Sequence, residues 1–177
     1  MTTYDEIDLR HAAEAAIRAP SLHNSQPWRF RLRDGGIEIL ADPSRRLPVA
    51  DGGGWAVRIA CGAAVFNARL ALADAGVPAQ VVLRPHGTEL DVIARLTPGP
   101  VRPPTYAERD LFAAVPRRRS NRQPFWPDPV PADIRVRLIE AARAEGCWLD
   151  LLVGMTALTG FAQIGRASCR ERVSTIV

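Results

Sequence analysis

The sequence predicts an α+β fold, with helices flanking a mixed or antiparallel sheet. Two observations support this prediction: a long apolar helical stretch over residues 55–75, and pairs of short strand patterns joined by turn residues on both sides of it. Helices mixed with hairpins, rather than a regular strand–helix alternation, are typical of the α+β class. With 177 residues, 47% of them apolar, the chain can form one domain, or one domain and the start of a second.

A helix followed by a hairpin is predicted near the N-terminus. Residues 5–18 carry apolar side chains at roughly helical spacing, and Pro20 sets the end of this helix. Residues 28–32 and 37–41 read as strands on either side of an Asp-Gly pair, which favours a hairpin turn. These elements leave residues 19–27 as a loop between the helix and the first strand.

The strongest helix prediction covers residues 55–75, where apolar side chains occupy nearly every face. A helix of this kind is buried inside a fold or in an interface. Gly76 and Pro78 follow it and are expected to end it. The preceding residues 42–54 are rich in Pro, Gly and Asp, so we expect a surface loop, with Asp51 among its surface contacts.

The domain organisation is read from a proline-rich stretch, residues 97–105, with four prolines in nine residues. We predict a first lobe over residues 1–98, a linker over 99–105 and the start of a second lobe over 106–163. Residues 164–177 interrupt a helical pattern and read like a translated sequencing adapter, so we expect a non-native tail on a C-terminally truncated chain. With three Arg and one Glu, this tail supplies half of the formal net charge of +4.

The remaining elements follow the same local rules. They are strands over residues 80–83, 89–96 and 147–153, helices over 106–115 and 132–145, a polar loop over 117–131, and a further helix that starts at Thr156.

Composition excludes several classes of protein. No run of eighteen apolar residues is present, so no membrane span or membrane partner is expected, and the acidic N-terminus lacks a signal core. The three cysteines are far apart and the three histidines add no ligand spacing, which argues against a metal site or a disulfide framework. All basic residues are arginine, a pattern we attribute to a GC-rich genome rather than to a nucleic-acid partner. A cytoplasmic protein is expected.

The loop over residues 19–30, APSLHNSQPWRF, concentrates turn-forming and short polar residues. A core does not need them, whereas a loop that packs against a flat polar ligand does. The segment resembles the flavin-contacting loop of the nitroreductase family, Pro-Ser-x-x-Asn-x-Gln-Pro-Trp. The resemblance implies that FMN is contacted by Pro20, Ser21, Leu22 and Asn24. On its residues alone, the loop also reads as an elaborate helix stop followed by a turn.

A second segment, residues 117–125, reads RRRSNRQPF. It resembles the Arg-x-Ser-x-Arg phosphate-binding element of the same family, which implies that Arg118, Ser120 and Arg122 hold the FMN phosphate and ribityl chain. Guanidinium groups pair bidentately with phosphate. The alternatives are a solvated basic loop or a nucleic-acid contact; the run is short and no basic helix face recurs, so no nucleic-acid partner is expected.

The resemblance implies a nitroreductase-like fold and an oxidoreductase that passes hydride from NAD(P)H through FMN to a small nitro or quinone-like acceptor. The loop precedes the arginine element, an order that resembles the two-lobe, Acg-like branch, in which an intramolecular pseudo-dimer replaces the dimer. The second lobe would be incomplete here, so self-association of the fragment is possible. The flavin does the chemistry in such proteins, so no catalytic side chain and no metal ligand is assigned. The alternative is a flavin-binding storage or stress protein with little turnover.

Overall fold

The computed structural model describes residues 3–85, 91–121, 123, 128–152, 154, 156, 159–161 and 163. The chain forms two compact units, residues 1–122 and 123–177. The first unit contains α1 (Glu6–Ala16), β1 (Trp28–Arg33), β2 (Gly36–Ala41), α2 (Trp55–Asp74), β3 (Ala79–Leu83), β4 (Val92–Pro98) and α3 (Tyr106–Ala114), and the 3-10 turns η1 (Leu22–Asn24), η2 (Pro43–Arg45) and η3 (Val115–Arg117). The second unit contains α4 (Ala132–Ala144).

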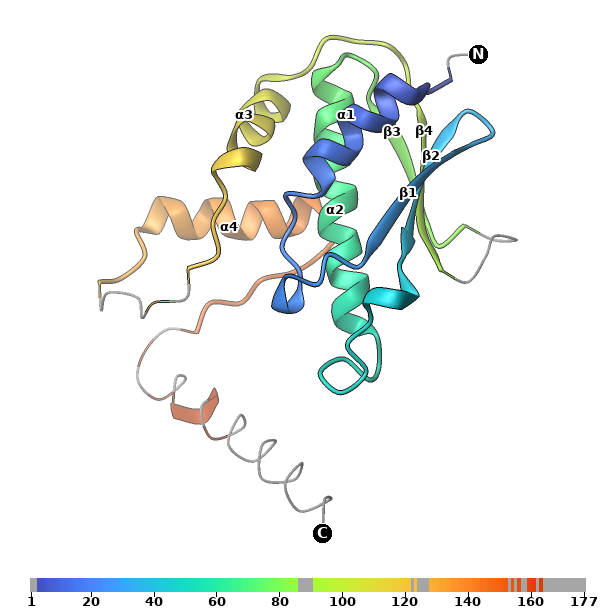
Figure 1. Ribbon diagram of the computed structural model, residues 1–177. Coiled ribbons are helices and arrows are strands. Elements are labelled where there is room, and N and C mark those ends of the chain that lie inside the picture. The colour runs from blue at the N-terminus through green and yellow to red at the C-terminus, as the bar shows by residue number, and fades with distance from the viewer. Residues whose placement is uncertain are drawn as a thin grey trace. The chain divides into compact units, whose positions relative to one another are not determined.

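The sheet of the first unit has four strands in the order β1-β2-β4-β3, and every neighbouring pair is antiparallel (Figure 1). The predicted hairpin is confirmed: β1 and β2 pair from Trp28↔Ala41 to Arg33↔Gly36. Its two turn residues, Asp34 and Gly35, both have positive φ (48° and 68°), as the favoured hairpin turn requires. The α+β class is therefore confirmed, with a purely antiparallel sheet.

The core lies between this sheet and the helices α1 and α2, which cover one of its faces (Figure 1). The largest fully buried apolar side chains come from three elements: Ile37, Ile39, Leu72 and Leu96. Strand residues alternate between the core and the outer face because the side-chain period of a strand is two. The outer face accordingly carries charge, with Glu38 between Arg31 (2.8 Å) and Arg95 (3.9 Å).

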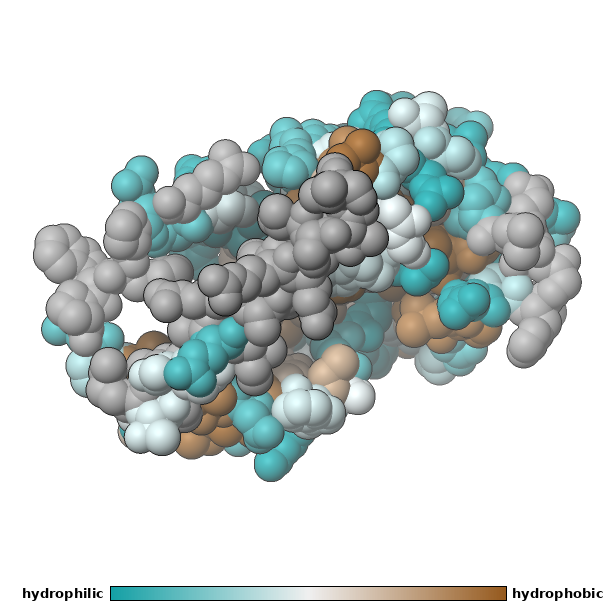
Figure 2. Space-filling model, turned by 90° about the horizontal axis from the view of Figure 1, so that it is seen from below, coloured by the Kyte–Doolittle hydropathy of each residue, from teal (hydrophilic) through white to brown (hydrophobic). Residues whose placement is uncertain are grey.

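The predicted long helix is present as α2 and ends as expected, with Gly76 at φ +86° and its N–H bonded to the carbonyl of Ala73. By length and composition alone α2 could cross a membrane, but more than half of it is buried inside the fold, as in the core helix of a globular domain. Its burial is one-sided near the start, where Trp55 and Ile59 are 62% and 61% exposed. Exposed apolar side chains form separate patches among hydrophilic ones (Figure 2).

The proline-rich stretch does not end the first compact unit. After β4 the chain leads into α3, which packs against α2, so the unit continues to residue 122. Arg102 and Thr105 lie just before α3 and stabilise its start. Glu108 accepts hydrogen bonds from Arg102 (2.6 and 2.8 Å) and from the backbone N–H of Thr105 (2.7 Å). The predicted lobe boundaries at 98 and 106 stay a prediction.

The second unit differs from the prediction in one element. Helix α4 confirms the predicted helix over 132–145, but residues 147–152 are exposed and form no strand. A strand needs a neighbour for its N–H and C=O groups, and the described part of this unit supplies none. Residues 156, 159–161 and 163 are helical, whereas the tail over 164–177 lies outside the described residues.

Candidate functional site

The predicted flavin loop is a compact turn held by its own backbone. Ser21 closes it twice: its carbonyl accepts from the N–H of Asn24 (3.0 Å), and its hydroxyl oxygen accepts from the N–H of Gln26 (3.0 Å). The N–H of Ser25 bonds to the carbonyl of Leu22 (3.0 Å). The loop then joins β1 through Pro27, which is fully buried. The short hydroxyl side chain at position 21 therefore determines the shape of the loop.

Backbone strain is concentrated in this loop. His23, Asn24 and Gln26 have φ values of 51°, 57° and 49°, in a region that non-glycine residues rarely adopt. Only two other described non-glycine residues, Asp34 and Arg84, share this region. Such strain costs of order 1–3 kcal/mol per residue, and it clusters at ligand-binding sites where the surrounding structure enforces it.

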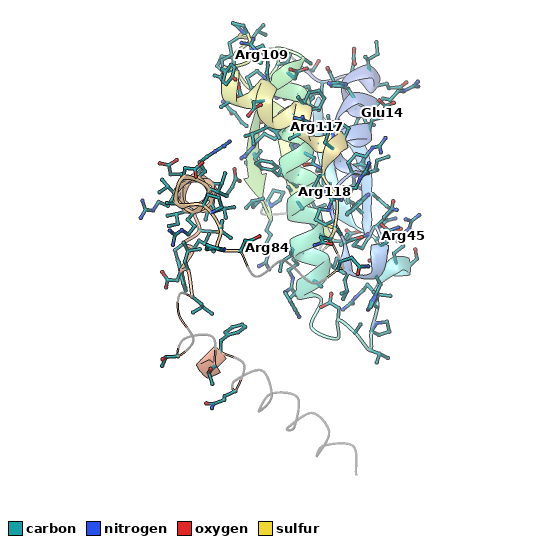
Figure 3. The ribbon with its side chains drawn as sticks, turned by 90° about the vertical axis from the view of Figure 1, so that its left-hand side faces the viewer. Glu14, Arg45, Arg84, Arg109, Arg117 and Arg118 are labelled. Carbon is teal, nitrogen blue, oxygen red and sulfur yellow. The ribbon has the colours of Figure 1, made fainter. Side chains whose placement is uncertain are left out.

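Arg118 connects the second segment to the start of this loop. Its Nε and Nη2 both donate to the carbonyl of Arg18 (3.2 and 3.0 Å), and its Nη1 donates to the hydroxyl oxygen of Ser120 (3.3 Å). Arg18 lies two residues before Pro20, so the two predicted segments meet although one hundred residues separate them. Figure 3 labels Arg117 and Arg118 near each other in the first unit, with Arg45 farther to the right.

A second guanidinium holds the other end of the loop. Arg45, at the end of η2, donates from Nη1 to the carbonyl of Gln26 (3.2 Å), and its Nε lies 3.6 Å from the Asp42 carboxylate. The loop is thus held at its entry by Arg118 and at its exit by Arg45. The sequence predicted surface contacts for Arg45 but gave no signal for this contact with Gln26 across nineteen residues.

Buried Asp51 is a further residue whose role was wrongly predicted. It was expected to make surface contacts, but it is 3% exposed, and its carboxylate accepts from the N–H groups of Ala56 (3.1 Å) and Val57 (3.0 Å). Burial alone would raise the pKa of Asp51, but these backbone hydrogen bonds outweigh it and hold the pKa below the ordinary value. The carboxylate thereby caps α2. The available signal was Asp at the start of the Gly-rich turn before a helix.

Asp51 also contributes to a small pocket beneath the loop. Its lining is mostly apolar and comes from the loop, the η2 region and the first turn of α2: Leu22, Ser25, Pro27, Leu47, Asp51, Ala56 and Val57. The underside of the loop is therefore supported by α2, while its outer side stays open.

The polar groups at the loop and at Arg118 fit the two ends of FMN. The backbone N–H groups of Leu22 and His23 and the Asn24 amide have no hydrogen-bond partner among the described residues, and the three residues are exposed. Such donors suit a flat ring whose edge carries acceptors. Arg118 uses three of its five N–H groups within the protein, which leaves two for a phosphate oxygen.

The other predicted site residues divide into two groups. Pro20 is exposed at the loop entry, and Ser120 is exposed beside Arg118. Arg122 lies outside the described residues. Arg117, to which no role was assigned, donates to the carbonyl of Ala113 at the end of α3 (3.1 Å). Across the described residues, no group of three or more His, Cys, Asp or Glu side chains is placed to hold a metal ion.

The chain is similar in sequence to proteins named as nitroreductases. The chain is 35% identical over 140 residues to the "Putative NAD(P)H nitroreductase Rv3131" of Mycobacterium tuberculosis, covering 78% of this chain and 40% of that protein. It is 36% identical over 152 residues to the "Putative NAD(P)H nitroreductase acg" of the same organism, covering 86% of this chain and 45% of that protein. The chain is homologous to part of these nitroreductase-named proteins.

These relatives are longer, and the chain spans less than half of the length of each. No protein-family model matches the chain. A solved structure of a nitroreductase family protein from Streptococcus pneumoniae superposes with a TM-score of 0.45 at 17% identity, over 75% of this chain and 88% of that one, a likeness too weak to support a conclusion.

Proposed function

We propose that this chain is part of an FMN-dependent NAD(P)H oxidoreductase of the nitroreductase family, acting on small nitro or quinone-like acceptors. The observation that supports this most is the contact between the two segments. Arg118, which keeps two N–H groups without a partner among the described residues, donates to the carbonyl of Arg18, just before the strained loop over residues 20–26. The N–H groups of Arg118 suit the phosphate of FMN, and the hydrogen-bond donors of the neighbouring loop suit the ring of the same molecule.

The roles of the residues follow from the groups they present. Arg118 and Ser120, with Arg122 by the resemblance, would hold the phosphate and ribityl chain. Leu22, His23 and Asn24 would donate hydrogen bonds to the ring edge, while Pro20 and Ser21 fix the backbone that aims these donors. When bound, FMN supplies hydride transfer between NAD(P)H and the acceptor, and hydrogen bonds near the ring tune its potential. No side chain of this chain needs to act as a catalytic acid or base.

The arrangement of the complete protein is also a proposal. The chain spans less than half of its relatives' length, and α2 leaves Trp55 and Ile59 exposed one helical turn apart. Both observations favour the two-lobe architecture, in which a further lobe of the same chain covers this end of α2 and completes an intramolecular pseudo-dimer. Without that lobe, we expect the exposed apolar side chains to promote self-association.

The test is a titration of the purified chain with FMN, followed by absorbance and flavin fluorescence, with riboflavin as the matched ligand that lacks the phosphate. We expect FMN to bind and riboflavin to bind markedly more weakly. Equal affinity would contradict the phosphate role of Arg118, and absence of binding to either would contradict the flavin site. Steady-state NAD(P)H oxidation with a nitroarene then separates an enzyme from a flavin-storage protein.

A further inference from the structure

We propose that Arg46 and Arg58, with the Gly52-Gly53 turn between them, form a second anion site that binds a phosphate group of the dinucleotide electron donor. The existence of the site rests on its geometry, whereas the identity of the ligand rests on the proposed function.

The two guanidinium groups converge over one glycine. A Cβ atom placed on Gly54 would lie 3.5 Å from Nη2 of Arg46 and 3.8 Å from Nη2 of Arg58, so these two nitrogen atoms are at most about 7 Å apart. Arg58 is held in this position by the bond from its Nη2 to the carbonyl of Gly53 (3.1 Å). Gly54 has φ +66°, so the turn that brings the arginines together favours the glycine found there.

The charges of this pair are not matched by nearby carboxylates. Within the described residues, neither Arg46 nor Arg58 forms an ion pair or a hydrogen bond with an acidic side chain. Asp42 accepts from Ser44 (2.7 Å) and lies near Arg45, while both oxygens of buried Asp51 accept backbone N–H groups. The charge of Arg46 helps to lower the pKa of Asp51 at longer range, but the two form no ion pair in the described structure.

The gap between the arginines suits a phosphate. Charge-assisted N–H···O bonds of about 2.7–2.9 Å can join a single phosphate to two nitrogen atoms that lie no more than about 7 Å apart. The exposed N–H groups of Gly52 and Gly53 have no partner among the described residues and can donate to the same ligand. An anion at this place would also relieve the repulsion between two like charges. The N-terminus of α2 itself is not the anion site, because the Asp51 carboxylate already accepts hydrogen bonds from its N–H groups.

The position of this site favours the electron donor over FMN as its ligand. Arg118 marks the phosphate end of the proposed flavin site, at the loop entry beside Arg18. Arg46 follows Arg45, which contacts the opposite end of the loop at Gln26. One FMN phosphate cannot occupy both ends, so the second anion site is available to a dinucleotide whose nicotinamide stacks on the ring.

The test uses the 177-residue chain and isothermal titration calorimetry with inorganic pyrophosphate, NADPH and FMN in turn. The double variant Arg46→Gln/Arg58→Gln is compared with the wild type and with Arg109→Gln, which removes one exposed charge from α3. We expect the double variant to lose about tenfold or more in affinity for pyrophosphate and NADPH, since two charge-assisted contacts are removed. FMN affinity and the control should change less than about twofold.

Three results would overturn the proposal. They are a wild-type chain that binds neither pyrophosphate nor NADPH, an equal loss in the Arg109→Gln control, and a loss of FMN affinity in the double variant with NADPH unaffected. The FMN titration of the wild type reports separately on the proposed function. A chain that fails to bind FMN but loses pyrophosphate in the double variant would contradict the flavin site and leave the arginine site standing.

Discussion

Replacing Arg118 by alanine tests the junction between the two segments most directly. The guanidinium bonds to the Arg18 carbonyl at 3.0 and 3.2 Å and to Ser120 at 3.3 Å, and it keeps two N–H groups for an anion. Removing a hydrogen bond to a charged group costs about 1.5–3 kcal/mol, which corresponds to roughly 10- to 150-fold weaker FMN binding. The exposed bonds to Arg18 are worth about 0.5–1.5 kcal/mol of stability, or about 2–6 °C in Tm.

The assay is flavin fluorescence titration combined with thermal unfolding, on variants at two adjacent positions. Arg118→Lys keeps the charge but lacks the planar fork, so it cannot hold the Arg18 carbonyl and a phosphate together. We expect its affinity for FMN to lie between those of the wild type and Arg118→Ala. Arg117→Ala is the matched control, because the hydrogen bond of Arg117 within the described residues goes to the end of α3. The reasoning is refuted if Arg118→Ala binds FMN as the wild type does, or if Arg117→Ala weakens binding equally.

Three further predictions concern stability. Gly36→Ala should destabilise the fold by about 1–3 kcal/mol, because its Cβ would lie 2.9 Å from a backbone oxygen of β4. Gly62→Ala, where the added methyl group of α2 meets open space, should stabilise the fold by about 0.5–1 kcal/mol. Chemical denaturation measures both free energies of unfolding. Burial raises the pKa of Cys61 from 9.0 to about 12, so above pH 9 the thiol loses its proton on unfolding. The stability of the fold should therefore fall as the pH rises from 9 toward 12. A Cys61→Ala variant whose stability falls equally steeply would contradict this. The hydrogen bond from Arg102, and those from Thr105, lower the pKa of Glu108 to about 2. The start of α3 should therefore lose stability as the pH falls from about 4.5 toward 2. Amide exchange should detect this loss, and Glu108→Gln should abolish its pH dependence.

Sequence periodicity was sufficient for elements whose own residues determine them. The first hairpin follows from its Asp-Gly turn, and α2 follows from twenty mostly apolar residues without a proline and a glycine shortly after them. The strand predicted over 147–153 failed because a strand depends on a neighbour that the described part of its unit lacks. The apolar pattern of these residues reflects their side chains and carries no information on whether a neighbouring strand is present to pair with.

The candidate site was predictable in its segments but not in its contacts. Local residue types identified the loop and the arginine element, whereas the bond from Arg118 to Arg18 crosses one hundred residues and leaves no trace in either segment. The contact of Arg45 with the Gln26 carbonyl was missed for the same reason. Asp51 differs, because its bonds to Ala56 and Val57 are local and its place before the Gly-rich turn was an available signal. An arginine in a polar loop gives no sign of the distant backbone group it will contact.

The contact between Arg118 and Arg18 has a consequence for how the protein is made. Synthesis at about 5–20 residues per second separates these two residues by about 5–20 s, during which α1 and its loop exist without the guanidinium that later holds them. Contacts of such high sequence separation close late, since the chain between them must first be ordered. The strained loop is therefore expected to be among the last parts of the first unit to become native. A nascent chain halted before residue 118 would carry this loop without the guanidinium that holds its entry.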